Sequence, residues 1–158
     1  MTACTRQQID YSVLAGPLGK YSVKLPTPIV PALTGNKYVI IGSGVGGLSA
    51  AWQLALRGHE VTIFERSQSL GGKMTQAIPH ERLPDDILQT EIRQILDLGV
   101  KVEYNCDITR KKFDNLYKSF DGLVIAIGAL KPRIPEFNGN EKAVSALEYL
   151  TSSNNRQP

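Results

Sequence analysis

From Lys37 onward, apolar residues gather into short runs separated by longer stretches of mixed character. Runs such as KYVIIG and GLVIAIG are apolar almost throughout, which is typical of strands buried on both faces of a parallel sheet. Together with the runs EVTIFE and VKVEYN, they predict four strands, at residues 37–42, 60–65, 100–105 and 122–128.

The stretches between and after these runs have the spacing of helices. In residues 84–99 the apolar positions recur on one helical face, at Leu88, Ile92, Ile95 and Leu96. Helices are expected at residues 44–57, 84–99, 112–120 and 143–150. Strands that alternate with helices predict an α/β fold, a Rossmann-like doubly wound parallel sheet of the FAD/NAD(P)-binding type.

The two ends of the chain differ from this pattern. Residues 1–36 include Pro26, Pro28 and Pro31, which disfavour both helix and central strand, so an extended N-terminal arm is expected there. The Rossmann-like domain is expected to span residues 37–150, and residues 151–158 are expected to form a disordered tail.

Three glycines follow the first expected strand in a fixed spacing. Gly42, Gly44 and Gly47 form the pattern G-x-G-x-x-G. The first glycine permits a tight turn, the second lets the backbone approach a pyrophosphate, and the third lets the helix pack closely on the strand. The free amides at the start of that helix then face the phosphates, with the helix dipole behind them.

An acidic residue closes the second expected strand. Glu65 stands where a carboxylate accepts hydrogen bonds from an adenosine ribose. Because a carboxylate repels a 2′-phosphate, NADP is disfavoured at this site. The order of strand, glycine loop, helix, strand and acid therefore predicts dinucleotide binding.

A second glycine pair, Gly71 and Gly72, follows in ERSQSLGGKM. NAD-binding Rossmann domains have no general need for this pair. The stretches GGKMTQAIPHERLPDDIL, EIRQILDLGVKVEYNCDI, FDGLVIAIGALKPRIPEFNG and AVSALEYL follow in order. With them, residues 37–150 resemble the FAD-binding half of the glutamate synthase small-subunit family. That family includes the flavin domain of dihydropyrimidine dehydrogenase and, more distantly, adrenodoxin reductase.

The resemblance implies an FAD site assembled from several places in the chain. The pyrophosphate would be wrapped by the first glycine loop, the adenosine held at the end of the second strand and after the third, and the flavin-side phosphate and ribitol met by the second glycine pair. The residues at the pyrophosphate would be Gly42, Ser43, Gly44, Val45 and Gly46, with Ala126 and Gly128 passing nearby. The residues at the adenosine would be Glu65, Arg66 and Ile108, and those at the flavin-side phosphate and ribitol would be Gly72 and Lys73.

The chain also departs from the family pattern. The family continues into an NADPH domain, whereas this sequence stops shortly after Leu150, and its last strand motif reads Ala-Ile-Gly in place of the usual Ala-Thr-Gly. No cysteine pair follows Gly72, so thiol–disulfide exchange is not expected. Residues 1–36 hold a single cysteine, Cys4, too few for an iron–sulfur cluster. No catalytic side chain and no metal site are expected.

Composition narrows the picture further. The net charge of +3 is small, and lysines and arginines are scattered, so no nucleic-acid partner is expected. No apolar run is long enough to span a membrane, and the N-terminus does not resemble a signal peptide. Two cysteines, Cys4 and Cys106, fit a reducing cytoplasm.

These features favour an FAD-binding oxidoreductase module, or a subunit of an NAD(P)H-linked electron-transfer complex. A protein partner would then supply the NAD(P)H site or an iron–sulfur acceptor, and the chain alone is not expected to turn over NAD(P)H. Three alternatives stay open at this point. They are a non-catalytic scaffold that keeps the fold, an NAD-binding Rossmann module without flavin, and a fragment or truncated gene product.

Overall fold

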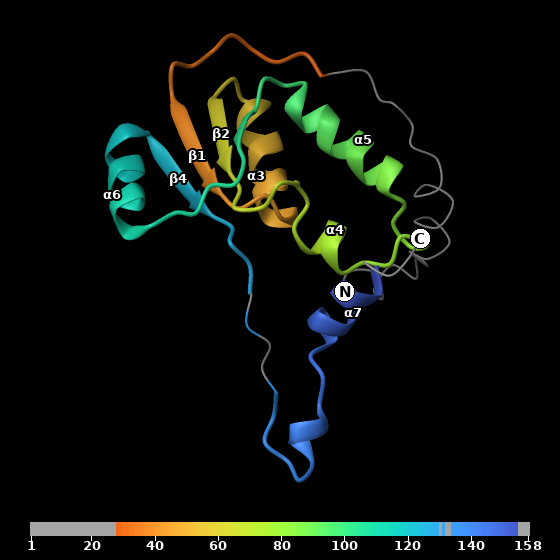
Figure 1. Ribbon diagram of the computed structural model, residues 1–158. Coiled ribbons are helices and arrows are strands. Elements are labelled where there is room, and N and C mark those ends of the chain that lie inside the picture. Colours follow the sequence, from red (N-terminus) through yellow and green to blue (C-terminus); the bar gives the residue numbers. More distant parts are fainter. Residues whose placement is uncertain (1–27, 130, 132–133, 155–158) are drawn as a thin grey trace, which may run out of the picture.

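The fold is built on a four-stranded parallel sheet. The computed structural model describes residues 28–129, 131 and 134–154 (Figure 1). Most of the expected N-terminal arm and residues 155–158 lie outside this range. The strands are β1 (Lys37–Ile41), β2 (Glu60–Phe64), β3 (Lys101–Glu103) and β4 (Gly122–Ile125). They lie in the order β3-β2-β1-β4, which is the arrangement of a Rossmann-like sheet and confirms the predicted fold class.

Helices cover both faces of the sheet. The helical segments are α3 (Val45–Ala55), α4 (Lys73–Gln76), α5 (Asp85–Leu96), α6 (Arg110–Ser119), the short 3-10 helix η1 (Asn140–Lys142) and α7 (Ala146–Asn154). Figure 1 shows α3 and α5 on one side of the sheet and α6 on the other side, beside β4. No helix in the described ranges is long and apolar enough to cross a bilayer.

The core lies between the sheet and the layer of α3 and α5. Ile40 and Ile63, each the fourth of five residues in one of the two middle strands, are completely buried. Leu88 and Ile92 of α5 are buried as the helical pattern predicted, and Ile95 and Leu96 are partly buried against the same cluster. The apolar runs therefore form the strands, and the apolar helical face closes the core.

The strands end earlier than the apolar runs do. β4 stops at Ile125, so Ala126 and Gly128 belong to the loop that leaves the sheet rather than to the strand. β3 stops at Glu103, and Asn105 follows with a left-handed φ of 51°, which turns the chain across the end of the sheet. The early end of β4 matters because Ala126, Ile127 and Gly128, which follow it, line the candidate site.

Two boundaries at helices also differ from expectation. α6 begins at Arg110, two residues earlier than predicted, because Thr109 caps it by accepting a hydrogen bond from the Lys112 amide at 3.3 Å. α7 runs to Asn154, so residues 151–154, which were expected to be part of a tail, are helical. The division into arm, domain and tail otherwise remains a prediction.

The described end of the arm is fastened to the turn between α3 and β2. Thr34 donates its amide hydrogen to the carbonyl of Gly58 at 2.9 Å, and its hydroxyl lies 2.6 Å from Nδ1 of His59. The His59 ring also packs on Tyr38, with ring centroids 4.8 Å apart. His59 therefore helps to join the arm to the sheet.

Candidate functional site

The carboxyl ends of the four strands meet at one edge of the sheet, and two adjoining hollows open there. The first hollow has a volume of about 190 Å³ and the second about 390 Å³. They share Gly42, Glu65, Arg66 and Ile127 in their walls. Ligands of open parallel sheets bind at this edge, so the hollows lie where a dinucleotide is expected.

Every residue that the sequence singled out for the cofactor lies in these walls. The first hollow is lined by Gly42, Glu65, Arg66 and Ile108. The second is lined by Gly42, Ser43, Gly44, Val45, Gly46, Glu65, Arg66, Gly72, Lys73, Ala126 and Gly128. The fold thus brings together residues that are up to 86 positions apart in the sequence, from Gly42 to Gly128.

Two glycines of the first loop are required by the packing of the chain itself. Gly42 has a φ of 98°, and a Cβ placed there would lie 2.5 Å from the carbonyl oxygen of Ala126. A Cβ on Gly47 would collide with the carbonyl oxygen of Gly42. These contacts let β4 pass close to the loop and let α3 pack on the strand, the roles expected of the first and third glycines.

Gly44 and Gly46 differ from these two glycines. A Cβ at either position would meet no protein atom within 4 Å. Gly44 also has an ordinary extended conformation, with φ −69° and ψ −173°, so the backbone does not require glycine there. Since neither packing nor backbone explains these glycines, the free space beside them in the second hollow fits a ligand that approaches the backbone closely.

The second glycine pair rests directly on the first loop. The amide of Gly71 donates a hydrogen bond to the carbonyl of Ser43 at 3.0 Å. Gly72 has a φ of 55°, and a Cβ there would lie 3.2 Å from the Cα of Gly44. Lys73 follows at the start of α4 and is exposed. The two glycine loops therefore form one continuous wall of the second hollow.

Glu65 ties the end of β2 to the glycine loop. Its Oε2 accepts hydrogen bonds from the amide and the hydroxyl of Ser43, at 2.9 and 2.6 Å, and its Oε1 accepts one from the amide of Ser67 at 2.8 Å. The residue is only 7% exposed. A carboxylate offers about four acceptor sites, so three are used within the chain and about one is left for a ligand hydroxyl.

These contacts also set the charge state of Glu65. Burial by itself raises the pKa of this carboxyl, but the hydrogen bonds from the hydroxyl of Ser43 and the amides of Ser67 and Ser43 outweigh burial, so the pKa lies below its usual value of 4.5. Glu65 is therefore ionised at neutral pH. A fixed negative charge at this point favours ribose hydroxyls and disfavours a 2′-phosphate.

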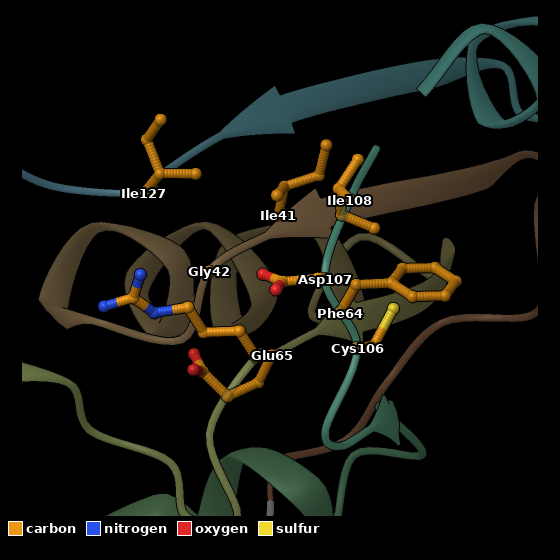
Figure 2. A pocket seen from close by; sticks show the side chains of 9 residues that line it. Ile41, Gly42, Phe64, Glu65, Cys106, Asp107, Ile108 and Ile127 are labelled. Atoms are coloured by element: carbon orange, nitrogen blue, oxygen red, sulfur yellow. The ribbon is translucent and has the colours of Figure 1, made fainter. Parts of the chain in front are cut away.

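The first hollow combines apolar and charged walls. Figure 2 shows Ile41, Ile108 and Ile127 along one side, with the carboxylates of Glu65 and Asp107 nearby. The segment 105–108 is held there because the amide of Cys106 donates to the carbonyl of Glu65 at 3.0 Å. An apolar slot with a few polar groups at its edge suits a flat, hydrogen-bonding ring such as adenine.

A buried thiol lines the first hollow. Cys106 is 9% exposed, and its Sγ lies 2.8 Å from Nζ of Lys112. The same ammonium group lies 5.1 Å from the centre of the Phe64 ring, which also lines the hollow. Lys112 thus holds Phe64 and Cys106 together as one wall.

Several lining residues were not expected from the sequence. They are Ile41, Phe64, Cys106, Asp107 and Ile127 in one or both hollows, and Ser67, Gln76 and Leu147 in the second. Most of them are next to a predicted residue in the sequence, as Ser67 is next to Arg66, and this adjacency could have indicated them. Leu147 had no such signal, because its place depends on how α7 packs.

Groups that could support other chemistry lie elsewhere. Nδ1 of His80 lies 3.2 Å from Oδ1 of Asp85, and His80 lines neither hollow. Within the described residues, no three His, Cys, Asp or Glu side chains are grouped so that they could hold a metal ion.

Comparison with known proteins agrees with this geometry. Residues 40–101 match a family model described as an NAD(P)-binding Rossmann-like domain. The glutamate synthase [NADPH] small chain of Bacillus subtilis (strain 168) is 38% identical over 124 residues, or 75% of this chain and 24% of that protein. The NADP(+)-dependent formate dehydrogenase subunit beta of Moorella thermoacetica is 46% identical over 99 residues, or 60% of this chain and 14% of that protein. The solved complex of 2-naphthoyl-CoA reductase with 2-naphthoyl-CoA matches with a TM-score of 0.64 and 30% identity, over 80% of this chain and 19% of that chain.

The order of the strands, the glycine loop at residues 42–47 and the acidic residue Glu65 together define a dinucleotide-binding domain. Its class is the Rossmann-like NAD(P)/FAD-binding domain. Within that class the chain is homologous to the glutamate synthase small chain, which confirms the resemblance predicted from the sequence. The chain spans less than a third of the length of the curated relatives it matches, from 6% to 29% of the first four.

Proposed function

We propose that this chain carries the FAD-binding part of an NAD(P)H-linked flavin oxidoreductase, in which electrons pass through the flavin to a partner. The observation that supports FAD is the pairing of the two glycine loops. Gly72 packs against Gly44, and both face the second hollow, where the first loop leaves free space. A Rossmann domain that binds only NAD has no general need for the second pair.

Three groups of wall residues are proposed to hold three parts of FAD. Gly42, Ser43, Gly44, Val45 and Gly46 would hold the pyrophosphate through their backbone. Glu65 would accept a ribose hydroxyl, while Arg66 and the backbone of Ile108 would contact the adenine in the first hollow. Gly72 and Lys73 would meet the flavin-side phosphate and ribitol, with Ala126 and Gly128 passing beside the pyrophosphate.

The chemistry itself belongs to the cofactor. When bound, FAD accepts a hydride and releases electrons one at a time, and the protein supplies binding, orientation and electrostatics. Glu65 keeps a negative charge at the adenosine end, and Lys73 adds a positive charge near the phosphates. No side chain of this chain is proposed as a catalytic acid, base or nucleophile.

The partner is the second part of the proposal. Two relatives are glutamate synthases named for NADH and NADPH, and the protein of Moorella thermoacetica is named as a subunit of an NADP(+)-dependent formate dehydrogenase. We propose that the two hollows together hold one nucleotide, the FAD, and that NAD(P)H is bound outside the described residues. An iron–sulfur protein is the proposed acceptor.

The test begins with the purified chain of 158 residues. Titration with FAD, followed by flavin fluorescence and calorimetry, is expected to show one site per chain, with FAD bound more tightly than FMN or NAD. The FAD-loaded chain is expected not to oxidise NADPH or NADH steadily. Equal binding of FMN would contradict the pyrophosphate and adenosine contacts, and steady oxidation of NADPH would contradict the need for a second nucleotide site.

An NAD-binding module without flavin is the second candidate, because the matching family model is described as NAD(P)-binding. The same titration separates the two. Tighter binding of NAD than of FAD would favour this candidate and overturn the proposed flavin site.

A further inference from the structure

α7 (Ala146–Asn154) is attached to the domain through α4. The chain leaves the sheet after β4 and returns so that α7 lies beside α4 (Figure 1). The side-chain amide of Asn154 donates to two carbonyl oxygens there, of Gln76 at 3.2 Å and of Ile78 at 3.0 Å. These bonds connect positions that are more than 70 residues apart in the sequence.

The two acceptors lie where α4 ends. Gln76 is the last residue of α4, and the final carbonyls of a helix have no partner within the helix. An asparagine side chain carries two N–H donors, so Asn154 can satisfy both carbonyls at once. The interaction therefore closes the end of one helix with the last residue of another.

The same two helices contribute to the second hollow. Gln76 and Leu147 both line it, one from each helix. The start of α7 is capped locally, because the hydroxyl of the buried Ser145 accepts a hydrogen bond from the amide of Glu148 at 3.4 Å. Leu147 is partly buried while Tyr149 is 66% exposed, so α7 turns its apolar side toward the domain.

We propose that Asn154 is a positioning residue, a latch that fastens α7 to α4 and thereby completes the wall of the second hollow formed by Gln76 and Leu147. The effect on ligand rests on the proposed function, because FAD is the ligand held there. Loss of the latch releases α7, withdraws Leu147 from the wall and lets FAD dissociate faster. The folded core is unaffected, since α7 contributes no residue to the buried cluster.

Asn154→Asp is the sharpest test. Aspartate has nearly the same size, but its carboxylate has no N–H to donate and faces two carbonyl oxygens. Ser153→Ala is the matched control, because Ser153 is an exposed neighbour on α7 that lines neither hollow. Hydrogen exchange of residues 146–154 is measured without ligand, and the dissociation rate of FAD is measured by stopped-flow fluorescence.

Asn154→Asp is expected to speed exchange in α7 and to raise the dissociation rate of FAD about fivefold to tenfold, as two neutral hydrogen bonds are lost. The midpoint of thermal unfolding and the Ser153→Ala values should match the wild type. Unchanged exchange in α7 would refute the latch. Faster exchange with an unchanged FAD dissociation rate would refute its role in the wall. Absence of FAD binding in the wild type would overturn the proposed function, while the exchange measurement would still decide the latch.

Discussion

Gly44→Ala tests the candidate site most directly. The added methyl group clashes with no atom of the protein, but it would overlap the space proposed for the ligand. A Cβ at residue 44 meets no protein atom within 4 Å. The position lines the second hollow and lies against Gly72, so the methyl group would occupy space proposed for the pyrophosphate.

The stability of the folded chain should change little. The φ of −69° and ψ of −173° at residue 44 are allowed for alanine. Removing glycine from the unfolded chain stabilises the fold by about 0.4–1 kcal/mol. Alanine is a poorer residue than glycine at the start of a helix, by a similar amount of roughly 0.5–1 kcal/mol. The two effects offset each other.

Ligand affinity should fall clearly. Forcing a methylene-sized group into a well-packed contact costs about 1–3 kcal/mol. That range corresponds to a Kd for FAD about 5-fold to 150-fold higher. Calorimetric titration with FAD measures the change, and thermal unfolding without ligand checks the fold.

Ser49→Ala is the control, since Ser49 is exposed on α3 and lines neither hollow. It should leave both the affinity and the unfolding midpoint unchanged. If Gly44→Ala bound FAD as tightly as the wild type, the pyrophosphate could not lie against this loop, and the reasoning would be refuted.

Three further predictions follow from the contacts around the site. Gly47→Ala should fail to fold or lose several kcal/mol, roughly 3 or more, because its Cβ collides with the backbone of Gly42, and a wild-type unfolding midpoint would contradict this. Since the pKa of Glu65 is lowered in the folded state, its contribution to stability is complete above about pH 4.5 and is lost as pH falls through the folded-state pKa. Ser43→Ala removes one of the hydrogen bonds that lower this pKa, so it should weaken the dependence of stability on acid pH in urea titrations. An identical pH profile for the variant and the wild type would be evidence against this role of Ser43. In a Cys4→Ser background, FAD should slow alkylation of Cys106, because this thiol lines the first hollow, where the adenine is proposed to bind. FMN has no adenine and should not slow the alkylation. Equal protection by FMN, measured by mass spectrometry, would place the adenine elsewhere.

The central part of the fold could be predicted from sequence because its signals are local. β1, β2 and β4 come from short runs rich in apolar residues, and Leu88 and Ile92 are spaced on one helical face. The glycine loop was predictable for the same reason, since the spacing of Gly42 and Gly47 is dictated by contacts with the adjacent strand and helix.

The rest depends on contacts between distant segments. Leu147 lines the second hollow only because α7 packs on α4, and nothing in its local sequence specifies that packing. The helical extension to Asn154 has the same origin, because its amide contacts Gln76 and Ile78 from the last turn. A polar stretch such as TSSN carries no helical pattern of its own, so tertiary contacts decide its structure.

The chain's own hydrogen bonds hold the glycine loop in shape before any ligand arrives. Glu65 binds the amide of Ser43, the amide of Gly71 binds the carbonyl of Ser43, and Gly42 is enclosed by Ala126. Because folding already orders this backbone, ligand binding loses little further conformational entropy there. The attachment of α7 differs, since its last turn is held to α4 through one amide side chain. Ligand-dependent change in hydrogen exchange should therefore be larger in α7 than in residues 42–47, and a larger change in the glycine loop would show that the loop is ordered by the ligand instead.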